Sequence, residues 1–131
     1  MARLLIAEDE QPVRDLLMRA LTLDGHEVEV APDGAAALDL LSSAGTFDLL
    51  LTDIRMPIMD GIALALAAAR DYPDLAIVLM TGYAGVRERA HGLDRLVYDV
   101  VLKPFSLSVM KQTLGRALAE RAAAPASRAE A

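Results

Sequence analysis

The chain contains no cysteine, which excludes disulfide-stapled folds and thiolate metal sites. It also lacks any apolar run near the roughly 18 residues that cross a membrane. Nothing resembles a signal peptide, because a predicted strand opens at Arg3, almost at the N-terminus. We therefore expect a cytoplasmic protein with no membrane partner.

Positive charge is also scarce, with 13 Lys and Arg against 19 Asp and Glu and a formal net charge of −6. Such a chain repels phosphate backbones and gains little from the counterion release that drives nucleic-acid binding. No nucleic-acid partner is expected. What the chain has instead is an apolar fraction of 54% over 131 residues, which suits one domain with a single core.

Short apolar runs alternate along the chain with longer amphipathic segments. The predicted strands are 3–7, 27–31, 48–52, 75–80 and 97–102, and the predicted helices are 12–24, 34–44, 61–71, 86–91 and 106–122. This alternation predicts βα units around a parallel sheet. Right-handed crossovers, with helices on both faces, favour the strand order 2-1-3-4-5. The predicted fold class is α/β, a doubly wound five-stranded parallel sheet flanked by five helices.

Two segments are predicted with less regular structure. Three glycines and a weak apolar period in 82–96 predict a short or mobile helix there. Small polar residues around Pro125 predict a flexible tail over 122–131, which leaves one domain over 1–121. In the first helix, an apolar stripe is predicted to face the core: Val13, Leu16, Leu17, Ala20 and Leu21.

Four of the five predicted strands run directly into a chemically distinctive residue. These residues are Glu8 and Asp9 after the first strand, Asp53 after the third, Thr81 after the fourth and Lys103 after the fifth. The carboxyl ends of parallel strands meet at one edge of the sheet, where open α/β sheets bind their ligands. The sequence therefore predicts an acidic pocket at this edge.

Glu8, Asp9 and Asp53 would repel one another in such a pocket, because two like charges near 4 Å cost about 4 kcal/mol at an effective dielectric of 20. Protonation, an approach by Lys103, or a hard divalent cation could relieve this repulsion. We favour Mg²⁺ together with Lys103. In the plainer interpretation, Glu8 and Asp9 only favour the positive end of the following helix, and Asp53 only begins a turn.

Asp53 is the predicted nucleophile. A carboxylate beside Mg²⁺ can attack phosphorus and form an aspartyl phosphate, while a lysine charge and a hydroxyl stabilise the transferred group. The loop 54–61 that follows Asp53 carries turn signals and can present a backbone carbonyl to the metal. Taken alone, Thr81 could bind local backbone and Lys103 could be a surface lysine.

Four segments resemble the signature of bacterial response-regulator receiver domains, the chemotaxis-regulator-like family with a flavodoxin-like fold. They are Ala7-Glu8-Asp9, Leu51 to Gly61, Met80-Thr81-Gly82 and Leu102 to Phe105. The resemblance implies that Asp53 accepts a phosphoryl group from a histidine kinase or a histidine phosphotransfer protein. It further implies that Mg²⁺ binds Asp9, Asp53 and the main-chain carbonyl of Arg55, with Glu8 acting through water. Thr81 and Lys103 would bind the phosphoryl oxygens, and the Lys103–Pro104 peptide bond would be cis.

The resemblance implies a two-component response regulator in a phosphorelay. We expect a single-domain protein, because the receiver fills the chain from residue 3 and only a short tail remains. We expect no enzyme activity beyond self-catalysed phosphoryl transfer and autodephosphorylation. Output would pass to a downstream protein. The segment Thr81-Gly82-Tyr83-Ala84 is similar to that of CpdR-type regulators of alphaproteobacteria, which prime a protease for substrate delivery.

Other functions fit the sequence less well. The alternative within the family is the receiver domain of a hybrid histidine kinase, acting as a phosphorelay intermediate. An aspartate-nucleophile phosphatase would need a second acid two residues after Asp53, but that position is Arg55. A flavin carrier would need a phosphate-binding loop after the first strand, but that position holds the acidic run Glu8-Asp9-Glu10. One departure from the family pattern is Val100, where many receivers have a switching aromatic residue. Tyr98 is predicted to point to the same face of the sheet as Val100.

Overall fold

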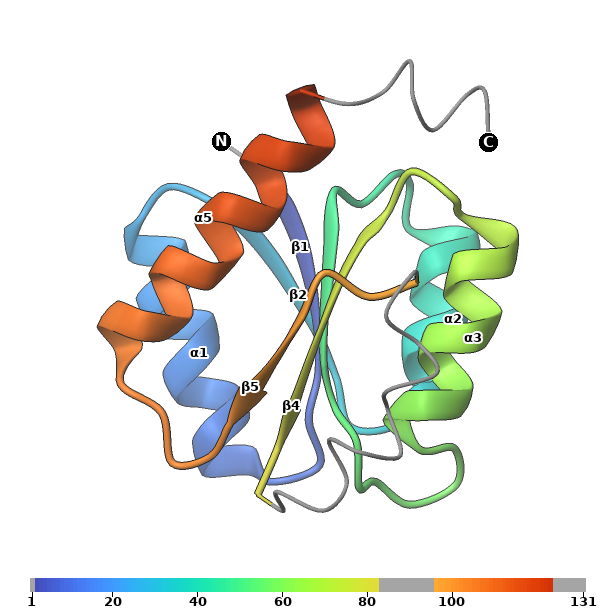
Figure 1. Ribbon diagram of the computed structural model, residues 1–131. Helices are drawn as coiled ribbons and strands as arrows, with labels where there is room; N and C mark the ends of the chain where they lie inside the picture. Colours follow the sequence, from blue (N-terminus) through green and yellow to red (C-terminus); the bar gives the residue numbers. More distant parts are fainter. Residues whose placement is uncertain (1, 83–95, 124–131) are drawn as a thin grey trace.

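A computed structural model describes residues 2–82 and 96–123 of the chain. One parallel sheet has the order β2-β1-β3-β4-β5 (Figure 1). Its strands are β1 Arg3–Ala7, β2 Glu27–Ala31, β3 Leu49–Asp53, β4 Ala76–Thr81 and β5 Asp99–Leu102. The helices are α1 Gln11–Leu23, α2 Gly34–Ser43, α3 Gly61–Asp71 and α5 Leu107–Ala123. The predicted fold class and strand order are confirmed.

Most boundaries differ from the predicted ones by one or two residues. The third and fourth strands each start and end one residue later than predicted, so Asp53 and Thr81 are their last residues. The predicted helix 86–91 lies outside the described residues. Helix α5 continues to Ala123, and the rest of the predicted tail, 124–131, also lies outside them. Among the described residues, no helix combines the length and apolar character of a membrane span.

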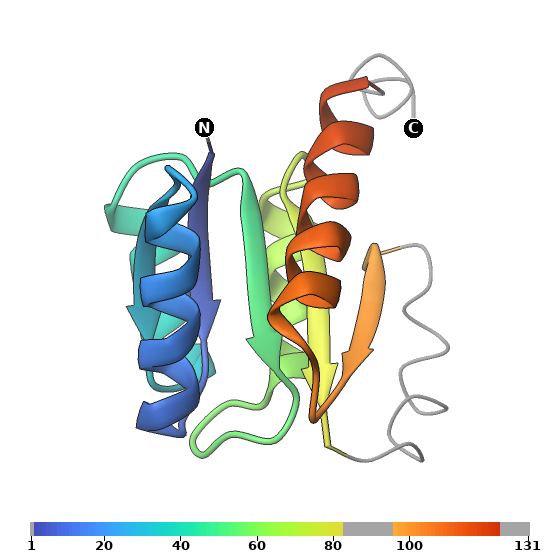
Figure 2. The ribbon, with the colours of Figure 1, turned by 90° about the vertical axis from the view of Figure 1, so that its left-hand side faces the viewer.

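Helices cover both faces of the sheet, and this arrangement explains the apolar runs. Helices α1 and α5 pack on one face, and α2 and α3 on the other (Figures 1 and 2). Neighbouring strand residues enter opposite clusters: Leu50 packs with α2 and α3, whereas Leu51 packs with α1 and α5. Central strands covered on both faces are therefore largely apolar, as β3 is up to Thr52 and β4 is up to Thr81.

Two predicted orientations are wrong. Leu16 is 48% exposed, and the buried residues of α1 are Leu17, Ala20 and Leu21. Each helical residue turns by about 100°, so Leu16 falls on the flank of a stripe centred on these three. Tyr98 packs against the α1 and α5 side, whereas Val100 packs against the α2 and α3 side. Strand β5 starts only after Tyr98, so strand alternation does not extend back to this residue.

Candidate functional site

The carboxyl edge of the sheet brings together residues that lie far apart in the chain. The register aligns the strand ends, pairing Ala7 with Thr52, Asp53 with Met80, and Thr81 with Leu102. Figure 2 shows the arrowheads of the strands at this edge, with the β3–α3 loop beside them. Residues that end these strands, or follow them directly, therefore face a common space.

Lys103 joins two buried carboxylates in this space. Its Nζ lies 2.6 Å from Glu8 Oε1 and 3.0 Å from Asp53 Oδ2. Glu8 is completely buried, and Asp53 is 6% exposed. A third carboxylate, that of exposed Glu10, lies 3.8 Å from the same ammonium group. Three acids thus share one lysine, and the cluster keeps a negative charge when all of them are ionised.

Burial dominates the ionisation of Glu8. It raises the pKa of Glu8 to about 7, against hydrogen bonds from Lys103 and the Glu10 N–H group that lower it, and the charge of Asp53 raises it further. Burial by itself would lower the pKa of Lys103, but its hydrogen bonds to Glu8 and Asp53 prevail, and that pKa is raised. Lys103 is therefore a cation near neutral pH, whereas burial favours the protonated form of Glu8.

The Asp53 side chain is held at both oxygens. Oδ1 accepts a hydrogen bond of 2.8 Å from the Ile54 N–H group, and Oδ2 accepts the one from Lys103. The Ile54 N–H group also donates to the carbonyl of Met80 on β4, at 3.1 Å. Asp53 is therefore presented in one orientation at the end of β3, between β1 and β4.

The β3–α3 loop packs tightly against the site. Gly61 donates its N–H group to the carbonyl of Ile54 at 2.8 Å, and a Cβ at Gly61 would lie only 2.0 Å from the carbonyl oxygen of Asp53. Any side chain at Gly61 would therefore push the helix away from Asp53. Asp60 caps α3 through a 2.8 Å hydrogen bond from the Ala63 N–H group. At the loop tip, Ile58 has a positive φ of 69°.

The structure places the other predicted site residues as follows. Thr81 is fully buried at the end of β4, and its carbonyl accepts a 2.7 Å hydrogen bond from the Lys103 N–H group. Arg55 lies in the β3–α3 loop with an exposed side chain, and Asp9 is exposed beside Glu8. The Lys103–Pro104 peptide bond is cis, as predicted.

Glu10 also belongs to this site, although it is not among the predicted site residues. Carboxylate oxygens of Glu8, Glu10 and Asp53 all lie within 4.8 Å of one another, and Asp9 is outside this group. The signal that could have identified Glu10 is the unbroken acidic run from Glu8 to Glu10. An all-oxygen donor set of this kind fits a hard divalent cation such as Mg²⁺.

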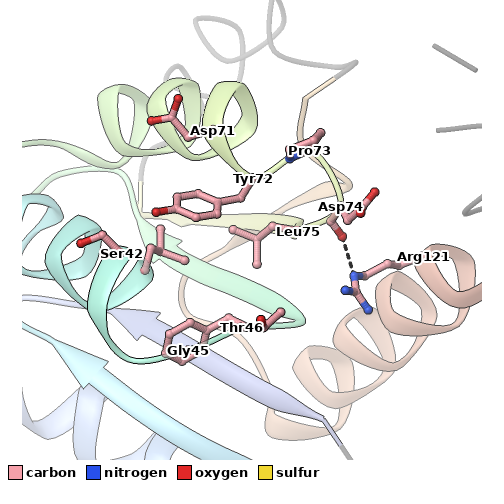
Figure 3. Close-up of a pocket in the computed structure, with 11 residues that line it drawn as sticks. Ser42, Gly45, Thr46, Asp71, Tyr72, Pro73, Asp74, Leu75 and Arg121 are labelled. Carbon is pink, nitrogen blue, oxygen red and sulfur yellow. Dashed lines mark hydrogen bonds between the residues drawn. The ribbon is translucent and has the colours of Figure 1, made fainter. Parts of the chain in front are cut away.

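A hollow of about 480 Å³ lies at the opposite edge of the sheet, between the α2–β3 and α3–β4 turns (Figure 3). Leu41, Phe47 and Leu75 contribute apolar surface to it. Arg121 of α5 also lines it and donates a hydrogen bond to the carbonyl of Asp74. None of the predicted site residues lines this hollow.

Comparison with known proteins points to one family. A family model described as "Response regulator receiver domain" matches residues 4–115. The chain is 37% identical over 119 residues to the response regulator MprA of Mycobacterium avium (strain 104), which covers 91% of the chain and 51% of MprA. The chain thus spans about half the length of the curated relatives it matches.

Solved structures show the same similarity. A CheY-like response regulator receiver domain protein from Methanospirillum hungatei JF-1 superposes with a TM-score of 0.86 at 26% identity, covering 92% of this chain and 96% of that one. The response regulator TrrA from Thermotoga maritima, crystallised in complex with Mg(2+)-BeF, superposes with a TM-score of 0.80 at 29% identity. That match covers 89% of this chain and 99% of TrrA.

Proposed function

The chain belongs to the response regulator receiver domain family, and from that premise we propose that Asp53 is its phosphoacceptor. Receiver domains of response regulators are phosphorylated by histidine kinases in two-component signalling. The observation that carries the assignment to Asp53 is its position: it ends the central strand, is nearly buried, and has Lys103 at 3.0 Å from Oδ2. Asp9 and Glu10, by contrast, are exposed.

The proposed reaction assigns a role to each group. An Asp53 carboxylate oxygen attacks phosphorus, the bond from phosphorus to the donor nitrogen breaks, and the donor histidine leaves. Lys103 and the Thr81 hydroxyl would bind phosphoryl oxygens as charge moves onto them. Glu8, Asp9, Glu10, Asp53 and the main-chain carbonyl of Arg55 are the groups proposed to hold Mg²⁺. Once bound, the metal supplies positive charge beside the phosphoryl group.

We propose that the output is a protein–protein interaction, with no enzyme activity beyond phosphoryl transfer to Asp53 and its hydrolysis. The net charge of −6 supports a protein target over a nucleic acid, and we propose that the chain acts in the cytoplasm. Control of a protease component, as in CpdR-type regulators, is a finer proposal that rests on the resemblance at Thr81-Gly82-Tyr83-Ala84. A relay role, with Asp53 passing its phosphoryl group to a phosphotransfer histidine, is the alternative.

Mass spectrometry of the intact protein tests the phosphoacceptor. After incubation with acetyl phosphate and Mg²⁺, the wild-type chain should gain the mass of one phosphoryl group, and Asp53→Asn should gain none. Asp48→Asn is the matched control, because Asp48 lies just before the other end of β3. This variant should be phosphorylated like the wild type. A wild-type chain that stays unmodified, or an Asp53→Asn chain that gains the group, would contradict the proposal.

A further inference from the structure

We infer that Arg14 is a positioning residue for the metal site, acting through the peptide group between Glu8 and Asp9. Arg14 lies at the end of the first turn of α1 and is half-buried. Its Nη1 donates a 2.8 Å hydrogen bond to the carbonyl oxygen of Glu8. The inference rests on the proposed function, in which the acids after β1 hold Mg²⁺.

The bond from Arg14 fixes more than one atom. The carbonyl of Glu8 and the N–H group of Asp9 belong to one planar peptide unit. When Arg14 holds the carbonyl oxygen, it therefore also restricts the orientation of this unit and the direction of the backbone at Asp9. A guanidinium group is planar and always charged, which makes it a well-ordered donor to a carbonyl oxygen. Arg14 therefore governs the direction in which the chain leaves β1 towards Asp9 and Glu10.

The same short stretch is held at three further points. The Glu8 N–H group donates to the carbonyl of Ala31 on β2 at 3.0 Å. Glu8 Oε2 accepts a 3.0 Å hydrogen bond from the Glu10 N–H group, and Glu8 Oε1 accepts the bond from Lys103. These contacts hold the Glu8 N–H group and its carboxylate, while Arg14 holds its carbonyl oxygen. Loss of the Arg14 bond would remove one of the four contacts on Glu8 and loosen the turn that carries three of the proposed ligands.

Arg14 affects Mg²⁺ binding in two opposite ways, and the direction in which substitution changes the Mg²⁺ affinity distinguishes them. As a nearby cation it repels a divalent ion, so removing its charge alone should tighten Mg²⁺ binding. As a positioning group it keeps the ligands in place, so removing its hydrogen bond should weaken Mg²⁺ binding. Groups that orient metal ligands typically affect affinity by about 10-fold or more, and we therefore expect positioning to prevail.

Calorimetric titration of the full chain with Mg²⁺ shows whether substitution of Arg14 weakens or tightens Mg²⁺ binding. Arg14→Met should bind Mg²⁺ about 10-fold more weakly than the wild type, and Arg14→Lys, which keeps a charged donor, should recover most of the loss. Arg19→Met is the matched control, because it removes one charge from an exposed position of the same helix. Its Mg²⁺ affinity should equal that of the wild type. Amide exchange at Glu10 should be faster in Arg14→Met, as expected for a freed turn.

An Arg14→Met chain that binds Mg²⁺ as tightly as the wild type, or more tightly, would overturn the inference. If Arg14→Met does not fold, Arg14→Leu gives the same test, because it also removes both the charge and the hydrogen bond and must bind more weakly if positioning prevails. A wild-type chain that binds no Mg²⁺ would instead contradict the proposed function. The two failures are therefore distinguishable.

Discussion

The two edges of the sheet use similar charged residues in different ways. At the amino edge, Asp48 accepts a 2.8 Å hydrogen bond from the Arg3 N–H group and pairs with Arg121 at 3.1 Å. The Arg3 side chain pairs with Glu27 at 3.3 Å. At the carboxyl edge, Glu8, Glu10 and Asp53 share Lys103. Asp48 and Glu27 at the amino edge thus each pair with an arginine, whereas three acids share one lysine at the edge where the candidate chemistry lies.

Backbone strain also differs between the two edges, and it too is greater at the carboxyl edge. In the α1–β2 and α2–β3 loops at the amino edge, the residues with positive φ are Gly25 and Gly45. In the β3–α3 loop at the carboxyl edge, the residue with positive φ is Ile58, a β-branched residue for which this conformation costs energy. Uncompensated charge and backbone strain thus gather at the edge that carries the site, a pattern common at functional sites.

The largest expected effect comes from the buried acid at the carboxyl edge. The pKa of Glu8 is about 7 in the folded chain, above its ordinary value of 4.5. Between these values the folded state binds more protons than the unfolded state, so the free energy of unfolding falls as pH rises from about 4.5 to 7. At pH 8 without Mg²⁺, Glu8→Gln should therefore be more stable than the wild type by up to about 3 kcal/mol.

Urea unfolding of both proteins across this pH range measures the effect, and their difference should vanish near pH 4.5. Glu10→Gln is the control, because Glu10 belongs to the same cluster but is exposed. It should retain the pH dependence of the wild type. Parallel profiles for the wild type and Glu8→Gln would contradict the idea that the charge excess at this edge costs stability.

A smaller effect is expected at the amino edge. Arg121→Met removes the pair with Asp48 and the hydrogen bond to the Asp74 carbonyl. Because both side chains are partly exposed, we expect a loss of about 1 kcal/mol in the free energy of unfolding. Mg²⁺ affinity and the phosphorylation rate should not change. Arg116→Met, at an exposed position of α5, should cost less; an equal loss, or a change in Mg²⁺ affinity, would erase the contrast between the edges.

The smallest expected effect concerns Ile58, whose side chain is 83% exposed. Ile58→Gly should raise the free energy of unfolding by about 0.5–1 kcal/mol, because relief of the left-handed conformation exceeds the entropy that glycine adds to the unfolded chain. Ile58→Ala keeps a Cβ and should gain less. Thermal or urea unfolding of the three proteins measures this order, and a loss of stability in Ile58→Gly would mean that the loop stores no strain there.

Much of the site could be predicted from the sequence because its parts follow from local rules. Apolar runs mark strands, alternation with helices makes the sheet parallel, and parallel strands end at one edge. Glu8, Asp53 and Lys103 meet for this reason. The choice among adjacent acids does not follow from the same rules, because Glu8, Asp9 and Glu10 leave the strand in a turn whose course depends on other elements. The contact from Arg14 is one such influence.

The amino-acid pattern alone determined the α/β class, the strand order and the meeting of Asp53 with Lys103, since periodicity and strand polarity act over a few residues at a time. Tertiary packing decided that Glu10 rather than Asp9 lies with Glu8 and Asp53, that Leu16 is exposed, and that Tyr98 and Val100 face opposite sides of the sheet. These outcomes depend on the direction in which a side chain leaves its element, and neighbouring elements set that direction.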